Sequence, residues 1–216
     1  LLARLFFIDG MVGVLTFGGV YASGTFGWGT TTLLIFGLCT SASAMLGAYF
    51  GGRLDDSLGS IRALQIAIST SALVLLLLVS VQPDTILYVI ETGTEPVWDS
   101  PYFATLPELF YFGTNQVFAV FFVTGLSASR TLMAKISPPE LATQFFGLFA
   151  LSATVTAFLA PLLVATATDV FNSQRIGFAS LASLMIIGAV MLLKVKEEQA
   201  TVVDINHDIS ANSTNR

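Results

Sequence analysis

The chain has 216 residues and a net charge of −5, and 54% of its residues are hydrophobic while only 11% are charged. A soluble domain usually carries about 25% charged residues, so this composition, with a mean hydropathy of +0.80, excludes a water-soluble globule. The nine Lys and Arg residues are scattered, which excludes the clustered basic patch of a nucleic-acid-binding protein. The chain starts at Leu1 without an initiator methionine or a signal peptide, and we expect a fragment of a longer protein.

Six stretches of the sequence are long and apolar enough to cross a membrane, since a spanning helix needs about 20 mostly apolar residues. These runs are too long and too continuously apolar for the alternating strands of a β-barrel. The sequence therefore predicts an all-α membrane protein, a six-transmembrane-helix bundle embedded in the lipid bilayer. The expected spans are residues 5–24, 30–51, 63–81, 108–127, 145–168 and 176–195.

The basic residues predict how this bundle lies in the membrane. If the N-terminus is cytoplasmic, every Lys and Arg residue except Arg175 falls on the cytoplasmic side. Membrane proteins carry such an excess of Lys and Arg in their cytoplasmic loops. We therefore expect both termini in the cytoplasm, with residues 197–216 as a polar, disordered cytoplasmic tail. That tail holds His207 and a glycosylation sequon at Asn212, which would lie on the wrong side of the membrane to be used.

The loop between the third and fourth spans, residues 82–107, contains no Lys or Arg but holds four carboxylates and four prolines. Prolines interrupt regular structure, so we expect an irregular segment with one short helical turn. Trp98, Tyr102 and Phe103 have the amphipathic aromatic character of residues that anchor a loop at the membrane interface.

Three further patterns concern how the helices pack and where they end. Cys39, Ser43, Gly47 and Gly51 recur every four residues, and this small-residue stripe predicts close contact between helices. Residues 137–140, Ser-Pro-Pro-Glu, have the pattern of a capping box with proline at the first helical position, and they predict the start of the fifth helix. Pro161 should kink that helix. Tyr21 near the outer end of the first span is either substrate-facing or an interfacial anchor, and the anchor is favoured.

The segment between the second and third spans carries the pattern G-x-L-x-D-x-x-G followed by a basic residue. Its candidate residues are Gly52, Asp55, Asp56, Gly59 and Arg62. The two glycines permit a tight turn, and a carboxylate such as Asp56 can accept backbone hydrogen bonds from a helix N-terminus. The segment resembles the cytoplasmic loop signature of the major facilitator superfamily, which implies a gating role. An ordinary solvated loop whose charges set the topology is the alternative.

Several short motifs occur in an order that narrows the resemblance. They are Arg4-Leu-Phe-Phe-Ile-Asp-Gly10, Phe17-Gly-Gly-Val-Tyr-Ala22, Ile136-Ser-Pro-Pro-Glu140, Phe145-Phe-Gly-Leu-Phe-Ala-Leu-Ser152 and Phe158-Leu-Ala-Pro161. From about residue 1 to 198 the chain resembles the C-terminal half of the vacuole-effluxer-like branch of that superfamily. This branch includes the yeast autophagy-related vacuolar amino-acid exporter and bacterial relatives.

The resemblance implies that the chain is one half of a twelve-helix major facilitator fold and lacks its N-terminal six-helix half. The solute would then bind between the halves near the middle of the membrane, with alternating access by rocking. The first, second, fourth and fifth helices of a half would line the cavity. The protein would reside in the plasma membrane if bacterial and in the vacuolar membrane if fungal.

Ionisable and amide side chains inside a span are candidates for the solute or ion pathway, because burying them in lipid is costly. Asp9 in the first span can take part in proton coupling or bind an amino group, or it can be a structural contact that orients helices. Asn115 and Gln116 in the fourth span and Thr154 in the fifth can bind a polar solute or can join helices by hydrogen bonds. Arg130 ends the fourth helix and could pair with Asp55, Asp56 or Glu140 as part of an inner gate.

These patterns predict a secondary transporter of small organic solutes, with amino acids as the expected class. A non-transporting membrane scaffold or receptor on the same fold is the alternative. The sequence contains no nucleophile–base pair, metal-ligand cluster or phosphate-binding loop, so we expect neither an enzyme nor a cofactor or metal. The single cysteine also excludes an internal disulfide.

Overall fold

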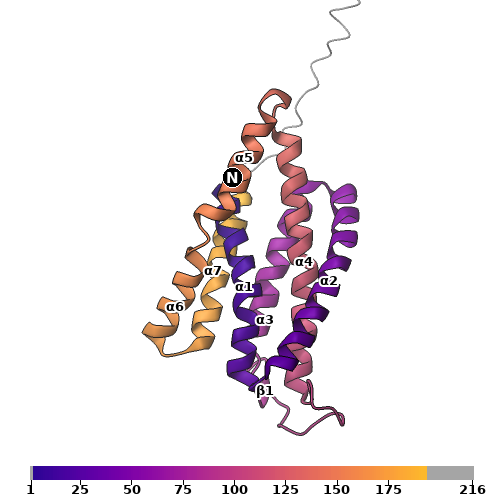
Figure 1. Ribbon diagram of the computed structural model, residues 1–216, viewed down its shortest axis with the longest axis vertical. Coiled ribbons are helices and arrows are strands. Elements are labelled where there is room, and N and C mark those ends of the chain that lie inside the picture. Colours follow the sequence, from indigo (N-terminus) through magenta and orange to yellow (C-terminus); the bar gives the residue numbers. More distant parts are fainter. Residues whose placement is uncertain (1, 194–216) are drawn as a thin grey trace, which may run out of the picture.

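A computed structural model describes residues 2–193 and confirms the all-α fold, with six helical spans long and apolar enough to cross a membrane (Figure 1). Each predicted span overlaps one of them. The predicted tail, with His207 and the Asn212 sequon, lies outside the described residues, as do Lys194 and Lys196. The helices are α1 (Leu2–Phe26), α2 (Thr30–Leu58), α3 (Ser60–Val79), α4 (Leu106–Ile136), α5 (Ala142–Val155), α6 (Leu159–Phe171) and α7 (Gln174–Leu192), with a short 3-10 turn, η1 (Pro139–Leu141), before α5.

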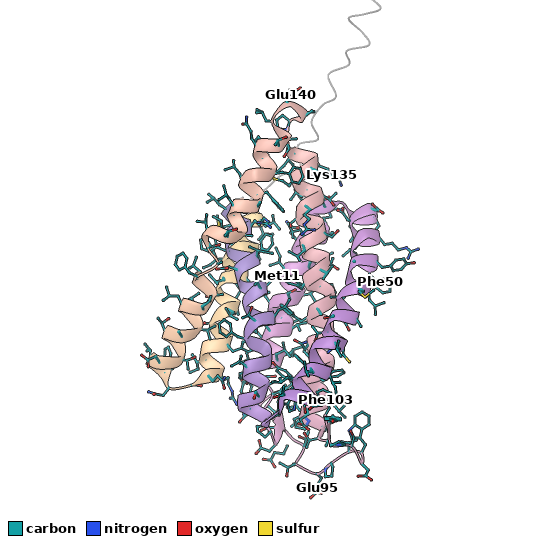
Figure 2. The ribbon with its side chains drawn as sticks, viewed as in Figure 1. Met11, Phe50, Glu95, Phe103, Lys135 and Glu140 are labelled. Atoms are coloured by element: carbon teal, nitrogen blue, oxygen red, sulfur yellow. The ribbon has the colours of Figure 1, made fainter. Side chains whose placement is uncertain are left out.

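The bundle has two ends that differ in structure. At one, here called the Gly59 end, α2 passes into α3 and α4 passes through η1 into α5; at the other, the hairpin end, residues 80–105 form the connection from α3 to α4. This connection contains a small antiparallel hairpin of β1 (Thr85–Ile86) and β2 (Ile90–Glu91). The expected helical turn is therefore wrong. Figure 2 shows Glu140 and Glu95 at the opposite ends of the molecule.

The capping box is also formed at a different place from the one predicted. At the start of α4, the backbone N–H of Thr105 donates to Glu108 Oε2 over 2.9 Å and the backbone N–H of Glu108 donates to Thr105 Oγ1. Ser137 instead closes the preceding helix, because its hydroxyl donates to the Met133 carbonyl over 2.6 Å. The Ser137 hydroxyl thus satisfies one of the carbonyls that lack a helical partner at the end of α4. Neither η1 nor α5 has a side-chain cap.

The fifth span is interrupted rather than merely kinked. Helix α5 stops at Val155 and α6 starts at Leu159, with Pro161 in the first turn of α6. Proline has no N–H and its ring crowds the carbonyl four residues earlier, which here belongs to Ala157. Between the two helices the backbone forms hydrogen bonds between residues three apart instead of four. For example, the Leu159 N–H donates to the Thr156 carbonyl over 2.8 Å.

The helices pack in an order that leaves α1 between two flanks. Helix α1 lies against α7, α3 lies against both α4 and α7, α2 packs on α4, and α6 packs on α7. In Figure 1, α2 and α6 form opposite edges of the bundle with α1 between them. Met11 of α1 is fully buried among these helices, whereas Phe50 of α2 points outward (Figure 2).

The predicted small-residue stripe forms the contact between α2 and α4. A side-chain carbon on Gly47 would collide with the Val120 carbonyl oxygen, and one on Gly51 would come within 2.8 Å of the Thr124 Cα. The backbones of the two helices therefore approach directly. Ser43, one turn earlier, donates its hydroxyl to Gln116 Oε1 over 3.0 Å. Close approach through small residues is a common way for membrane helices to associate.

Gly47→Ala should destabilise the protein, because the added methyl group meets backbone atoms of α4 that cannot rotate away. Overpacking of this kind costs about 1–3 kcal/mol. The free energy of unfolding of the full-length protein in detergent measures it. Gly113→Ala is the matched control, since a side-chain carbon there has no neighbour within 4 Å. Equal stability of the two variants would contradict the close α2–α4 contact.

Candidate functional site

One side of α1 is exposed, and hollows adjoin it on both flanks. Val12, Thr16 and Val20 are exposed at intervals of four residues, while Phe7 and Val14 face the core. We call Val12, Thr16 and Val20 the α1 stripe. Residues four apart lie on one face of a helix, so the stripe runs along one continuous side of α1. Three hollows adjoin it, and each contains at least one polar side chain.

The first hollow, of about 100 Å³, lies between α1 and the interruption of the fifth span and contains Asp9. The Asp9 side chain is only 5% exposed, and its Oδ2 atom has no hydrogen-bond partner among the described residues. Ala160, at the start of α6, lines the same hollow. A helix N-terminus favours negative charge, so this arrangement can hold a carboxylate while leaving one oxygen free for a proton or a cation.

Arg4 does not neutralise Asp9, although it lies only five residues away on the same helix. Its guanidinium donates to the Phe149 carbonyl over 2.8 Å and to Ser152 Oγ over 2.5 Å, and it sits 3.6 Å from the centre of the Phe149 ring. Arg4 therefore joins α1 to α5. The spacing of the two residues also disfavours an Arg4–Asp9 pair, because five residues turn a helix through about 140°.

The second hollow, of about 440 Å³, lies between α1, α2 and α4 and contains Asn115. Asn115 is 2% exposed, and its amide donates to Thr40 Oγ1 over 2.9 Å. Thr40 in turn donates to the Phe36 carbonyl over 2.7 Å. Asn115 therefore joins α4 to α2 and also borders the hollow. Its position is compatible with both the helix-joining and the solute-binding interpretation.

Gln116 and Thr154 do not border any of the three hollows. Gln116 accepts a hydrogen bond from Ser43 and donates to the Phe112 carbonyl over 3.1 Å, so its amide joins α4 to α2. Thr154 is exposed and donates only to the carbonyl of Ala150, over 3.4 Å within its own helix. The Gln116 contacts match the helix-joining interpretation, whereas the Thr154 hydroxyl bonds only within α5 and joins no helices.

The segment with the loop signature is mostly helical, which corrects the expectation of an open loop. Helix α2 continues to Leu58, so Gly52, Asp55 and Asp56 lie in its final turns and only Gly59 separates it from α3. Gly59 has φ +83°, a conformation that favours glycine. Gly52 makes no turn, and α3 begins without a side-chain cap from Asp56.

The two aspartates of this segment have different surroundings. Asp55 is 7% exposed, with no hydrogen-bond partner for Oδ1 among the described residues, whereas Asp56 is exposed. Arg62 and Arg130 are exposed as well. No ion pair forms within residues 2–193, so the suggested pairing of Arg130 with a carboxylate is absent there. Lys135 instead donates to Ser60 Oγ over 2.8 Å and joins α4 to the start of α3.

The third hollow, of about 340 Å³, was missed by the sequence interpretation. It lies between α1, α6 and α7 at the hairpin end and is bordered by Asp169 and Tyr21. Asp169 directly follows the predicted fifth span. An acidic residue at the end of a span was the feature of the sequence that could have indicated this hollow. Tyr21 is not an exposed anchor: it is 3% exposed, and its ring stacks on Phe178 with the ring centres 4.9 Å apart.

The six apolar spans define a multi-pass integral membrane protein, and polar side chains from α1, α4 and α6 line hollows beside α1. The profile of the family described as "Vacuole effluxer Atg22 like" matches residues 1–203, and the chain belongs to this family. A similar curated protein is the "Uncharacterized MFS-type transporter YxiO" of Bacillus subtilis (strain 168). It is 29% identical over 204 residues, covering 94% of this chain but only 42% of the relative. No solved structure matches.

The hydrogen bond between Asn115 and Thr40 should contribute measurably to stability. In a double-mutant cycle of Asn115→Leu and Thr40→Val, we expect a coupling energy of about 0.6–1.7 kcal/mol, as found for interhelical hydrogen bonds in membranes. Unfolding of the purified full-length protein in detergent supplies the four free energies. Thr166→Val is the control partner, since Thr166 bonds only to carbonyls of its own helix. Coupling with Thr166 as large as with Thr40 would contradict the assignment.

Proposed function

We propose that this chain is the C-terminal six-helix half of a secondary transporter that moves small organic solutes, specifically amino acids, by alternating access. The observation that carries the proposal is the α1 stripe with hollows on both flanks. The stripe itself holds two valines and one threonine, but the hollows beside it are lined by Asp9, Asn115 and Asp169. Charged and amide groups are costly next to lipid, whereas hollows that bind a polar solute require them.

The pattern of packing supports the same assignment of faces. In the most apolar stretch of each span, only 11% of the residues of α2 and 22% of those of the fifth span are buried. The corresponding share is 56% in both α1 and α3. The two flanking spans thus present broad apolar surfaces on either side of the α1 stripe. Exposed apolar residues on these flanks include Leu34, Leu38, Leu151 and Phe158. We propose that an N-terminal six-helix half covers this side, which closes the cavity.

The orientation completes the proposal. The excess of Lys and Arg at the Gly59 end supports a cytoplasmic location for that end, with the hairpin end on the opposite side. The Gly52–Arg62 segment and Arg130 then lie where an inner gate would operate, and the exposed Asp56 is available to a partner helix in the other half. The membrane is the plasma membrane in a bacterium and the vacuolar membrane in a fungus.

Asp9 is the residue we assign to proton coupling. Asp9 lines a hollow beside the exposed stripe, and its Oδ2 atom is buried without a hydrogen-bond partner among the described residues. A carboxylate that gains and loses a proton during the cycle changes its preference for the N-terminus of α6, since that end of a helix favours the charged form. Protonation of Asp9 would in this way change the contact between α1 and the fifth span.

Asp9→Asn should abolish proton-driven accumulation of amino acids while leaving amino-acid exchange at equal pH in place. The amide cannot carry the proton, but it has nearly the same shape as the carboxyl group. The measurement is uptake of labelled amino acids by the full-length protein in liposomes, with and without an imposed pH gradient. Asp99→Asn, which removes an exposed carboxylate of the outer loop, is the matched control and should transport normally.

Two results would oppose the proposal. Accumulation by Asp9→Asn equal to that of the unaltered protein would remove Asp9 from the coupling mechanism. Absence of flux for every amino acid would favour the alternative function, a non-transporting scaffold or receptor on the same fold.

A further inference from the structure

The interruption of the fifth span leaves main-chain carbonyls without their usual helical donors. Pro161 has no N–H, so the Ala157 carbonyl four residues earlier cannot receive its helical hydrogen bond. The N–H of Ala157 donates to the Thr154 carbonyl over 3.3 Å and not to the carbonyl of Ala153. Within the described part of the chain, the carbonyls of Ala153 and Ala157 receive no backbone hydrogen bond across the interruption. Such groups are costly inside a membrane unless another partner satisfies them.

The same two alanines border the Asp9 hollow, whose volume is about 100 Å³. Asp9 is only 5% exposed, and its Oδ2 atom has no hydrogen-bond partner among the described residues. Thr16 also borders the hollow. Its hydroxyl donates to the Val12 carbonyl over 3.0 Å, so the oxygen can still accept or coordinate. Carboxylate, hydroxyl and carbonyl oxygens therefore border one small space, and oxygen ligands are those that hard cations take.

The charge of this hollow is negative and is not balanced from within the chain's own α1. Of the residues that border the hollow, Asp9 is the only one with an ionisable side chain. Arg4 bonds instead to the Phe149 carbonyl and to Ser152 on α5. The end of α5 at Val155 adds partial negative charge, because the C-terminus of a helix favours cations. A buried carboxylate without a counter-charge is costly, so a bound cation would stabilise this arrangement.

We propose that the Asp9 hollow is a binding site for Na⁺, with Asp9 Oδ2, the Thr16 hydroxyl and the carbonyls of Ala153 and Ala157 as its ligands. In transporters with interrupted helices, the freed main-chain carbonyls and the C-terminal ends of half-helices coordinate such ions. A monovalent ion balances the single carboxylate, whereas a divalent ion would leave an excess charge within the membrane-spanning region, which is costly. A liquid water molecule occupies about 30 Å³, so the hollow holds a small ion with little water and excludes a bulky organic cation.

The ion site adjoins the rest of the candidate site. Thr16 borders both the Asp9 hollow and the Asn115 hollow, and the exposed Val12 and Thr16 of the α1 stripe provide a path for entry. Na⁺ and the proton assigned to Asp9 would occupy the same carboxylate in turn, so the two ions compete. The role of Na⁺ in the transport cycle rests on the proposed function, whereas Na⁺ binding by itself does not.

The test is equilibrium binding of radiolabelled Na⁺ to the purified full-length protein in detergent, with choline holding the ionic strength constant. The unaltered protein should bind Na⁺ saturably. Asp9→Asn should raise the dissociation constant at least about 100-fold, because it removes the only charged ligand. Asp99→Asn removes an exposed carboxylate at the hairpin end and is the matched control, with unchanged binding expected. Thermal unfolding of each variant establishes that it is folded.

A second variant tests the main-chain ligands and leaves Asp9 intact. Pro161→Ala supplies an N–H that can bond to the Ala157 carbonyl, so Na⁺ should bind about 10-fold more weakly, which corresponds to about 1.4 kcal/mol. Li⁺ should compete with Na⁺ better than K⁺ does, because a carboxylate attracts a smaller ion at shorter distance. Unaltered Na⁺ affinity of a folded Pro161→Ala variant would overturn the assignment of the carbonyls as ligands.

Two other results would overturn the whole site. They are the absence of saturable Na⁺ binding to the unaltered protein and unaltered Na⁺ affinity of a folded Asp9→Asn variant. Failure of the site is distinguishable from failure of the proposed function. Solute flux that depends on Asp9, in a protein that does not bind Na⁺, would remove the ion site and leave the transporter in place. Na⁺ binding that depends on Asp9, without any flux in liposomes, would support the ion site and contradict the transport function.

Discussion

The absence of an N–H group on Pro161 is the constraint on which the rest of this structure depends. Inside a bilayer every backbone polar group needs a partner within the protein, so a continuous helix is the default for each span. Pro161 makes that impossible in the fifth span, which stops at Val155 and resumes at Leu159. The interruption creates a helix N-terminus within the membrane-spanning region, and the carboxyl group of Asp9 lies beside it.

The two parts of the interrupted span then have different partners. Helix α5 is joined to α1 by the hydrogen bonds of Arg4 and by the Thr156 hydroxyl, which donates to the Leu5 carbonyl over 3.3 Å. Helix α6 packs chiefly on α7. On the other flank, the direct contact of Gly47 and Gly51 with α4 holds α2 against α4 rather than against α1. Both arrangements leave the same side of α1 exposed, which is why the hollows lie there.

Much of this fold could be predicted from the sequence, since spans depend on local hydrophobicity. The spans, the small-residue stripe of α2 and the effect of Pro161 all follow from short-range patterns. The capping box was assigned to the wrong helix because Ser137 can serve either the end of α4 or the start of the next helix, and only the fold decides. The segment from Gly52 to Gly59 was expected to be a loop because its two glycines permit a tight turn, yet the helix continues through Gly52 and ends only at Leu58.

The candidate site could be predicted in part. Asp9 and Asn115 were identified because polar side chains inside a span are costly, but the sequence could not distinguish Gln116, which borders none of the three hollows, from Asn115 beside it. The same limit applies to Asp55 and Asp56, adjacent residues of which one is buried and one exposed. Neighbouring residues on a helix point about 100° apart, and the tertiary packing determines which of them faces inward.

The most direct test of the central claim is the accessibility of α1 in the membrane. In a Cys39→Ala background of the full-length protein, single cysteines would replace Val12, Thr16 and Val20, with Leu73 and Leu76 of α3 as exposed apolar controls. A membrane-impermeant thiol reagent should modify the three α1 positions, with protection by amino acids, and should leave the α3 positions unmodified. If the α1 positions are as unreactive as those of α3, this side of α1 faces lipid and not a solute path.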